Sequence, residues 1–378
     1  MKKLLALLLC LAMVFTFAAC GGSSDSSEPA DQGGDEAAVS FDDIDDNCES
    51  EDGTYEVAMV TDVGQLKDGS FNQFTWNGVK MYAHENGKTY KYYQPANGSS
   101  ATDEDRMKAM RDAADAGAKV IVTTGFLQAS ALETVAPEYP DVQFIFVDGG
   151  SLGQPNVVGV SYKEEQAGYL AGYAAVMEGY TKLGFSGGGG GSNPACIRYG
   201  YGYAQGANAA AEAKGTDIEM RYSWEYGTQF QASDDLQAML AGWFNSGTEA
   251  CFMCGGTMFN SGAAAAEAAD AAIIGVDVDQ SPLSDTVITS AMKDLAGSVI
   301  QTIGEYYADN TVKGEDKNLG AAEGMIGLPT DTWSLQNWTV DDYNALFEQI
   351  KSGEITVDNN SEMADPSQAG LEHITFVD

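Results

Sequence analysis

Short apolar strands alternate with amphipathic helical segments along most of this chain, at intervals of roughly thirty residues. That interval is the length of one strand–helix–strand unit, and strands that are apolar on both faces belong in parallel sheets covered by helices. The first predicted strands are 55–61, 89–94, 119–124 and 142–147, with helices over 70–86, 101–116 and 128–136. Ser70 is the expected N-cap of the first helix, because serine side chains accept hydrogen bonds from helix N-termini. The pattern predicts an α/β fold.

A second set of alternating elements follows the first. Its predicted strands are 182–186, 218–224, 250–254 and 272–276, with helices over 163–178, 199–213, 232–245 and 259–269. Further elements near 286–290, 294–309, 322–328 and 340–351 indicate a chain that crosses back between two doubly wound units. We predict a first lobe from 53–160 plus about 286–325, and a second lobe from 161–285 plus about 326–378.

The first twenty residues have the layout of a secretory signal, in which Lys2 and Lys3 precede an uncharged apolar run over 4–19. This run is shorter than the ~20 residues that a membrane-spanning helix needs. Small residues followed by Cys20 resemble a bacterial lipobox, so we expect a signal peptide over 1–19 and a lipid on Cys20. An ordinary cleaved signal is the alternative. The acidic stretch 20–52 has the composition of a flexible tether, which places the body outside the cell with the lipid as its membrane contact.

Charge and composition exclude several classes of protein. The 56 acidic residues outnumber 19 basic ones and give a net charge of -37, which argues against a nucleic-acid partner. Because the chain has only two histidines, histidine triads and multi-imidazole metal sites are close to excluded, and we expect no metal ion or cofactor. Cys251 and Cys254 lie on opposite faces of a predicted buried strand, which favours structural cysteines over a redox pair or half of a zinc site. Cys48 and Cys196 could each form a disulfide in an oxidising exterior, and the sequence leaves their partners open.

Carboxylates and glycines follow the predicted strands, where open α/β sheets bind their ligands. The residues at these positions are Asp62, Gly125, Phe126, Asp148, Gly149, Gly255, Gly256 and Asp277. Each aspartate alone could be an N-cap or a turn residue, but together they favour a cleft. Carboxylates accept hydrogen bonds from sugar hydroxyls or from the N–H groups of a nucleobase. A phosphorylated ligand is disfavoured because few basic residues lie near these strand ends. Phe71, Phe126 and Phe230 offer flat faces for stacking, with ordinary core packing as the alternative for each ring.

Several motifs resemble the basic membrane protein family, which comprises lipoprotein receptors of ABC importers typified by the purine nucleoside receptor. The opening signature lies at 61–64, 68–73 and 76–78 and includes the Ser-Phe-Asn motif at 70–72. Further stretches match at 125–126, 146–148, 163–172, 274–280, 289–293 and 350–355. The resemblance covers about residues 55–357, and the Gly-Val-Asp-Val-Asp-Gln motif at 275–280 is among its more specific parts.

The resemblance implies a two-lobed type I periplasmic-binding fold that closes on a nucleoside, with a purine expected. By motif position, Phe71 stacks on one face of the base and either Phe230 or Tyr226 on the other. The remaining implied contacts are Asp62 and Asp148 to the base edges, Asp277 and Lys293 to the ribose, and Gly255 and Gly256 to the sugar through close backbone approach. Asn72 either orients its loop or touches the ligand. The chain departs from the family pattern at Val63 and by one extra residue within 227–230. The five consecutive glycines at 187–191 suggest a mobile loop at the rim of the cleft.

The first functional hypothesis is a monomeric, surface-tethered receptor, not an enzyme, that presents a nucleoside to an ABC permease. A sugar or another small polar ligand in the same fold is the nearest alternative. An extracellular hydrolase using paired carboxylates such as Asp277 and Asp279 is a further alternative, as is an adhesion or scaffold role.

Overall fold

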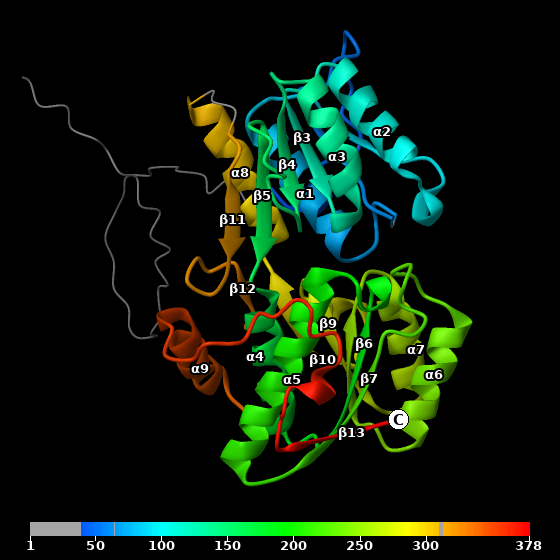
Figure 1. Ribbon diagram of the computed structural model, residues 1–378, viewed down its shortest axis with the longest axis vertical. Helices are drawn as coiled ribbons and strands as arrows, with labels where there is room; N and C mark the ends of the chain where they lie inside the picture. Colours follow the sequence, from blue (N-terminus) through cyan, green and yellow to red (C-terminus); the bar gives the residue numbers. More distant parts are fainter. Residues whose placement is uncertain (1–38, 64, 310–312) are drawn as a thin grey trace, which may run out of the picture. The chain divides into compact units, whose positions relative to one another are not determined.

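The computed structural model describes residues 39–63, 65–309 and 313–378, and residues Ser40–Asp378 form one compact unit (Figure 1). The predicted signal peptide over 1–19 and the lipidation site at Cys20 lie outside the described residues. Within the described ranges, no helix combines the length and the apolar character that crossing a membrane requires.

The first lobe is a six-stranded parallel sheet in the order β11-β5-β4-β3-β1-β2. Its strands are β1 (Val57–Val60), β2 (Tyr90–Tyr93), β3 (Val120–Thr124), β4 (Gln143–Val147), β5 (Val157–Tyr162) and β11 (Asp316–Leu319). Its helices are α1 (Phe71–Glu85), α2 (Asp103–Asp115), α3 (Ala129–Val135) and α8 (Leu295–Asp309). Val57 and Met59 of β1 pack on the side of α1 and α8, whereas Ala58 and Val60 face α2 and α3. Burial on both faces explains the unbroken apolar strands.

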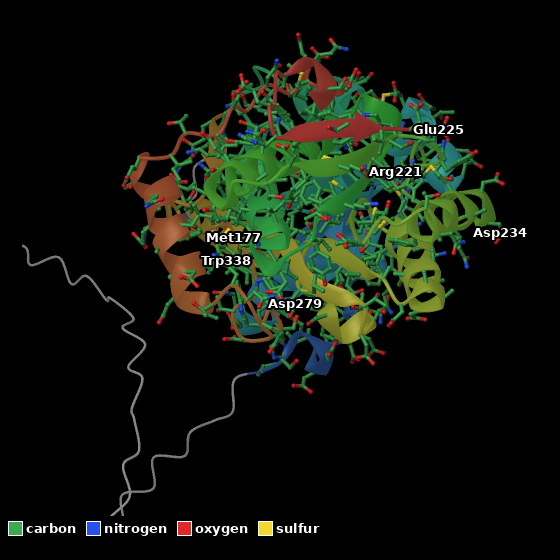
Figure 2. The ribbon with its side chains drawn as sticks, turned by 90° about the horizontal axis from the view of Figure 1, so that it is seen from below. Met177, Arg221, Glu225, Asp234, Asp279 and Trp338 are labelled. Carbon is green, nitrogen blue, oxygen red and sulfur yellow. The ribbon has the colours of Figure 1, made fainter. Side chains whose placement is uncertain are left out.

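The second lobe is a seven-stranded sheet in the order β12-β10-β9-β8-β6-β7-β13, parallel except for β12, which runs antiparallel to β10. Its strands are β6 (Lys182–Gly187), β7 (Ile218–Ser223), β8 (Ala250–Cys254), β9 (Ala272–Asp277), β10 (Val287–Lys293), β12 (Ile326–Gly327) and β13 (Ile374–Val377). Its helices are α4 (Glu164–Glu178), α5 (Pro194–Lys214), α6 (Asp234–Asn245), α7 (Met258–Ala269) and α9 (Val340–Ser352). Trp338, labelled in Figure 2, lies just before α9. Its ring packs against that of Tyr173 of α4, with the centroids 5.7 Å apart.

Three connections cross between the lobes: β5 to α4, β10 to α8 and β11 to β12. They are tied together by backbone hydrogen bonds, from Lys163 N to Leu319 O at 2.8 Å and from Asp294 N to Met325 O at 2.8 Å. The predicted fold class is confirmed: two mainly parallel sheets joined by crossing segments form a two-lobed periplasmic-binding fold.

Two predicted boundaries differ from the structure. Strand β10 pairs with β9 in the second sheet, whereas the predicted first lobe included 286–325. Residues 40–52, predicted as part of the tether, belong to the compact unit, where Ile44 is buried in the core. Asp46 accepts a hydrogen bond from Trp76 Nε1 at 3.1 Å and pairs with the buried ammonium of Lys80 at 3.0 Å. A buried lysine needs such a partner, so this segment is held against α1.

Candidate functional site

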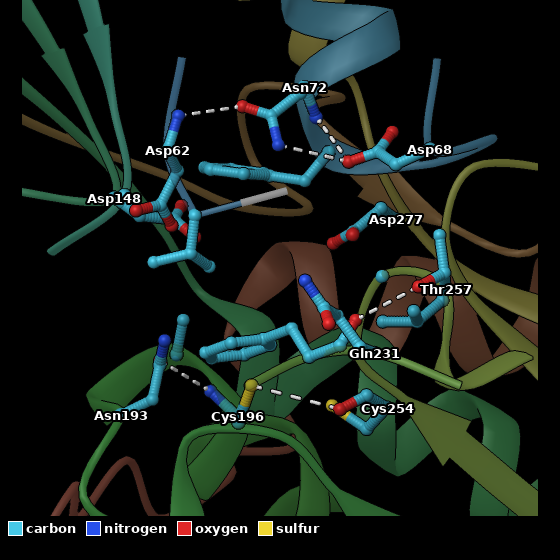
Figure 3. A pocket seen from close by; sticks show the side chains of 18 of the residues that line it. Asp62, Asp68, Asn72, Asp148, Asn193, Cys196, Gln231, Cys254, Thr257 and Asp277 are labelled. Atoms are coloured by element: carbon cyan, nitrogen blue, oxygen red, sulfur yellow. Dashed lines mark hydrogen bonds between the residues drawn. The ribbon is translucent and has the colours of Figure 1, made fainter. Parts of the chain in front are cut away.

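A cavity of about 380 Å³ lies where the carboxyl ends of strands from both sheets meet (Figure 3). Nine of the eleven predicted ligand-binding residues line it: Asp62, Phe71, Asn72, Asp148, Phe230, Gly255, Gly256, Asp277 and Lys293. Polar lining residues that were not predicted are Gln65, Asp68, Asn193, Tyr199, Gln231, Thr257 and Asn260. The described residues contain no group of three or more His, Cys, Asp and Glu side chains placed to hold a metal ion.

Phe126 and Tyr226 do not line this cavity. Phe126 is half-buried in a short 3-10 turn after β3, and only its neighbour Gly125 reaches the cavity wall. Tyr226 is 50% exposed to solvent. Of the two aromatic residues left open for the second stacking face, Phe230 is therefore the one at the cavity.

The side chain of Asp68, and not that of Ser70, caps helix α1. The Asp68 carboxylate accepts hydrogen bonds from the backbone N–H groups of Ser70 (2.9 Å), Asn72 (3.0 Å) and Gln73 (3.2 Å). Ser70 instead donates its hydroxyl to Asp277 Oδ2 across the cleft at 2.6 Å. Ser70 holds the N-cap position as predicted, but its side chain makes no capping bond. An aspartate two residues earlier accepts hydrogen bonds from the N–H groups at the helix start, which frees the Ser70 hydroxyl to join the lobes.

Asn72 fixes the backbone beside Asp62. Its Oδ1 accepts hydrogen bonds from Asp62 N and from Thr124 Oγ1, both at 3.0 Å, while its Nδ2 donates to Asp68 at 3.1 Å. The Asn72 amide thus joins the ends of β1 and β3 to the start of α1, and it orients the loop that carries Asp62.

Asp62 lies directly over Gly125. A Cβ atom at position 125 would come within 2.1 Å of Asp62 Oδ2, and the backbone there has a φ of +85°, so only glycine fits. Burial raises the pKa of Asp62 to about 7. Its Oδ1 is shielded from solvent and has no hydrogen-bond partner among the described residues, which leaves it available to a ligand.

The raised pKa of Asp62 predicts pH-dependent stability. Between its ordinary value and about 7, folded Asp62 holds a proton that the unfolded chain has lost, so its contribution to stability falls as pH rises through that window. In urea unfolding without ligand, Asp62→Asn should lose less stability than wild type between pH 5 and pH 8, by about 2 kcal/mol. The exposed Asp285→Asn is the control and should follow wild type; an Asp62→Asn profile parallel to wild type would contradict the assignment.

Lys293 is the only cation among the described lining residues, and carboxylates surround it. Its Nζ lies 2.7 Å from Asp148 Oδ2 and 3.6 Å from both Asp277 Oδ1 and Glu164 Oε1. It also lies 4.9 Å from the centroid of the Phe71 ring. Burial alone would lower the pKa of Lys293, but the three carboxylates raise it above its usual value, so the ammonium stays charged. This arrangement connects the first lobe, the crossing segments and the second lobe.

Acidic charge remains in excess around this lysine. Arg198 of α5 pairs with Glu164 at 2.7 Å and lies 3.9 Å from Glu165, and both glutamates are buried. Burial raises the pKa of Glu165 to about 7. Burial also raises the pKa of Asp148 to about 6, although Lys293 counteracts it. Asp148 Oδ1 has no hydrogen-bond partner in the described part of the chain, so a second acceptor is available to a ligand.

The five-glycine run at 187–191, expected as a mobile rim loop, is buried from Gly187 to Gly189. Gly188 and Gly189 pack against Phe230: an added Cβ atom would lie 2.4 Å from the ring at Gly188 and 3.1 Å from it at Gly189. Gly188 N donates to Cys254 O at 2.8 Å, and Gly189 N donates to Gly227 O at 3.0 Å. Because glycine has no side chain, the ring can rest directly on this backbone, which sets the position of one cavity wall.

A methyl group at position 188 should therefore displace the ring. Gly188 has φ of -77° and ψ of 164°, which alanine adopts without strain, so Gly188→Ala tests packing alone. We expect the affinity of an aromatic ligand to fall roughly tenfold, because the stacking geometry is lost. The control is Gly242→Ala on α6, where the added Cβ meets open space; ligand titration should give an unchanged affinity. Equal affinities for both variants would show that the glycine platform does not position Phe230.

Comparisons with known proteins agree with this architecture. Residues 55–361 match the family described as "ABC transporter substrate-binding protein PnrA-like". The ABC transporter nucleoside-binding protein BmpA of Lactococcus lactis is 28% identical, covering 68% of this chain and 76% of its own. Basic membrane protein A of Borreliella afzelii is 27% identical, covering 82% and 94%.

Among solved structures, an ABC transporter solute-binding protein from Aeropyrum pernix K1 aligns with a TM-score of 0.69. The alignment covers 84% of this chain and 97% of that chain at 23% identity, which establishes likeness of fold. The family match extends over both lobes and over every strand-end residue that lines the cavity. This protein belongs to the basic membrane protein (Bmp) family of ABC transporter substrate-binding proteins.

Proposed function

We propose that this substrate-binding protein takes up a nucleoside, with a purine base, in the cavity between its lobes and presents it to an ABC permease. The observation that carries the proposal is the pairing of an aromatic ring from each lobe, Phe71 and Phe230, in one cavity with two carboxylate oxygens that have no hydrogen-bond partner among the described residues. Flat rings bind a flat base, and unpartnered acceptors require a ligand that donates hydrogen bonds. The name of the Lactococcus relative, a nucleoside-binding protein, supports the same ligand class.

The side chains divide into a base region and a sugar region. Phe71 and Phe230 stack on the base, while Asp62 Oδ1 accepts a hydrogen bond from a base N–H group. Asp277 and Lys293 bind the ribose hydroxyls, and Asp148 Oδ1 lies beside them because its other oxygen holds Lys293 at 2.7 Å. One aromatic sandwich and a few charge-assisted bonds can supply the roughly -8.2 kcal/mol that a micromolar dissociation constant requires.

The charge of the cavity favours an uncharged ligand. Four aspartates line the cavity: Asp62, Asp68, Asp148 and Asp277. Among the described lining residues, Lys293 is the one cation that balances them. A nucleotide would bring a phosphate into this acidic surrounding, so we expect a nucleoside to bind and its monophosphate to be rejected.

The described lining residues of the cavity do not include the pair of carboxylates, Asp277 and Asp279, that a hydrolase was expected to use. Asp279, the possible partner of Asp277 in a hydrolase, does not line the cavity; its carboxylate accepts hydrogen bonds from Thr332 Oγ1 at 2.7 Å and from Ser281 N at 3.0 Å (Figure 2). We further propose that a lipid on Cys20 holds the monomeric protein on the outer face of the membrane. Replacing Cys20 with serine should release it from the membrane fraction.

Calorimetric titration of the full-length protein tests the ligand class. We expect micromolar binding of inosine or guanosine, weaker binding of cytidine, and no heat with inosine monophosphate or ribose. Chromatography of the bound nucleoside should recover it intact. Absence of heat with all the nucleosides contradicts the proposal, tight binding of ribose alone favours a sugar receptor, and released base indicates a hydrolase.

A further inference from the structure

Two free thiols, those of Cys196 and Cys254, lie side by side in the wall of the ligand cavity (Figure 3). Cys196 is in the first turn of α5, where Asn193 Oδ1 caps its backbone N–H at 3.1 Å, and Cys254 is the last residue of β8. The Cys196 Sγ lies 3.9 Å from the carbonyl oxygen of Cys254. The two thiols are also in side-chain hydrogen-bond contact, so they approach one another from different elements that are both held in place.

The other described cysteines cannot take part in this pair. Cys251 faces the opposite side of the sheet, in the core formed with α6 and α7, whereas Cys254 belongs to the core on the side of α5. Cys48 lies in the segment that packs on α1 of the first lobe and does not line the cavity. Cys196 and Cys254 are thus the two described thiols that share the cavity.

The two thiols differ in solvent exposure, and this difference determines which of them reacts first. Cys196 is 7% exposed, whereas Cys254 is fully buried. Burial first, and then the neighbouring Cys196 thiol, raise the pKa of Cys254 well above its usual value. Cys196 is the thiol with exposed surface, so a molecule in the cavity meets it first, whereas the buried Cys254, with its raised pKa, is a slow second reactant.

We propose that Cys196 and Cys254 form a modification site inside the ligand cavity, which reacts with small neutral or cationic disulfides and which bound ligand protects. The thiolate of Cys196 attacks one sulfur of a disulfide RS–SR; the S–S bond breaks, and RS⁻ leaves and takes up the proton that Cys196 lost. Cys254 then attacks the sulfur of Cys196 in the mixed disulfide and releases the second RSH. Two cysteine thiols are oxidised to one disulfide, and one RS–SR is reduced to two RSH.

The class of disulfide follows from the cavity. Its volume of about 380 Å³ admits only a small reagent, and its four aspartates against one lysine attract a cation and repel an anion. Because the first product is a mixed disulfide on Cys196, the R group occupies space that the ligand needs. A compartment outside the cytoplasm is oxidising, so such disulfides persist there.

The test compares cystamine, a cationic disulfide, with the anionic 3,3′-dithiodipropionate on the full-length protein, with peptide mapping by mass spectrometry. We expect Cys196 to react at least about tenfold faster with cystamine than with the anion. The final product should link the peptides that carry Cys196 and Cys254, and Cys254→Ser should stop at the mixed disulfide on Cys196. Cys48→Ser is the matched control and should react as wild type does, because Cys48 lies outside the cavity.

Several results would overturn the inference. These are an unmodified Cys196, equal rates for the two reagents, or a disulfide that joins Cys196 to a cysteine other than Cys254. Protection by nucleoside rests on the proposed function: saturating inosine should slow the reaction, and dithiothreitol should restore binding to the treated protein. If labelling occurs but inosine gives no protection and no heat, the thiol site stands and the nucleoside assignment fails. If inosine binds while Cys196 stays inert, the thiol site fails alone.

Discussion

Lys293→Met is expected to lower the free energy of unfolding by about 3–5 kcal/mol and to abolish measurable nucleoside binding, because it leaves buried carboxylates without their cation. Asp148, Asp277 and Glu164 all lie within 3.6 Å of the Lys293 ammonium. The variant should regain part of its stability at pH 5, because Asp148, whose pKa burial raises to about 6, can take up a proton there in place of the lost charge. Urea unfolding at pH 7.5 and pH 5, with calorimetry at both, measures the effect.

The control for this variant is Lys351→Met on α9. Lys351 also pairs with a carboxylate, Glu348 at 3.0 Å, but both side chains are exposed, so removal should cost less than about 1 kcal/mol. Equal losses of unfolding free energy in the two variants would mean that Lys293 contributes no more to stability than an exposed ion pair does. A stable Lys293→Met that binds nucleoside normally would remove the lysine from the proposed sugar site.

Removing either aromatic ring of the cavity, Phe71 or Phe230, should greatly weaken nucleoside binding. Phe71→Ala should weaken purine nucleoside binding by tenfold to a hundredfold, roughly 1.4–2.7 kcal/mol, since it removes both the stacking energy and the buried area of the ring. Phe126→Ala is the matched control, because this ring belongs to the same lobe and is half-buried like Phe71 but does not line the cavity. Its affinity should stay within about twofold of wild type.

The aromatic ring of the second lobe can be tested in the same way, by comparing Phe230 with the nearby Tyr226. Phe230→Ala should weaken binding by a similar factor, whereas Tyr226→Ala, which removes a half-exposed ring outside the cavity, should leave the affinity nearly unchanged. If Tyr226→Ala has the larger effect, the stacking partner on the second lobe has been assigned to the wrong residue.

The core of the fold was predictable because parallel strands buried on both faces leave long apolar runs in the sequence. Strands β1, β3, β4, β8 and β9 lie close to their predicted positions for this reason. The edge strand β11 was not predicted, because its sequence Asp-Lys-Asn-Leu has no apolar pattern and it becomes a strand only by pairing with β5. Helix α5 begins at Pro194, earlier than predicted, although Asn193 and Pro194 together form a recognisable helix start.

The site residues at strand ends could be predicted from the sequence. Residues in turns could not, because the direction of each side chain there depends on the backbone conformation. Asp62 lies two residues after β1 and Asp277 is the last residue of β9, so sheet topology alone places them at the cleft. Phe126 and Tyr226 are near lining residues in sequence, but a turn sends successive side chains to different sides, and only the backbone conformation decides which reaches the cavity. Phe230, for example, has a φ of 56°, which no sequence pattern indicated.

Asp68 and Cys196 were missed for a related reason. Both belong to helix N-termini that approach the strand ends from the loops, Asp68 just before α1 and Cys196 in the first turn of α5. The signal that could have found them is the rule that the helix following each strand begins beside the same cleft.

A crystal structure of the protein with inosine shows directly whether a nucleoside occupies this cavity. We expect the base between Phe71 and Phe230, an Asp62 oxygen within hydrogen-bonding distance of a base N–H group, and the ribose hydroxyls on Asp277 and Lys293. Inosine bound outside this cavity, or a base that contacts neither phenylalanine, would contradict the proposed nucleoside site.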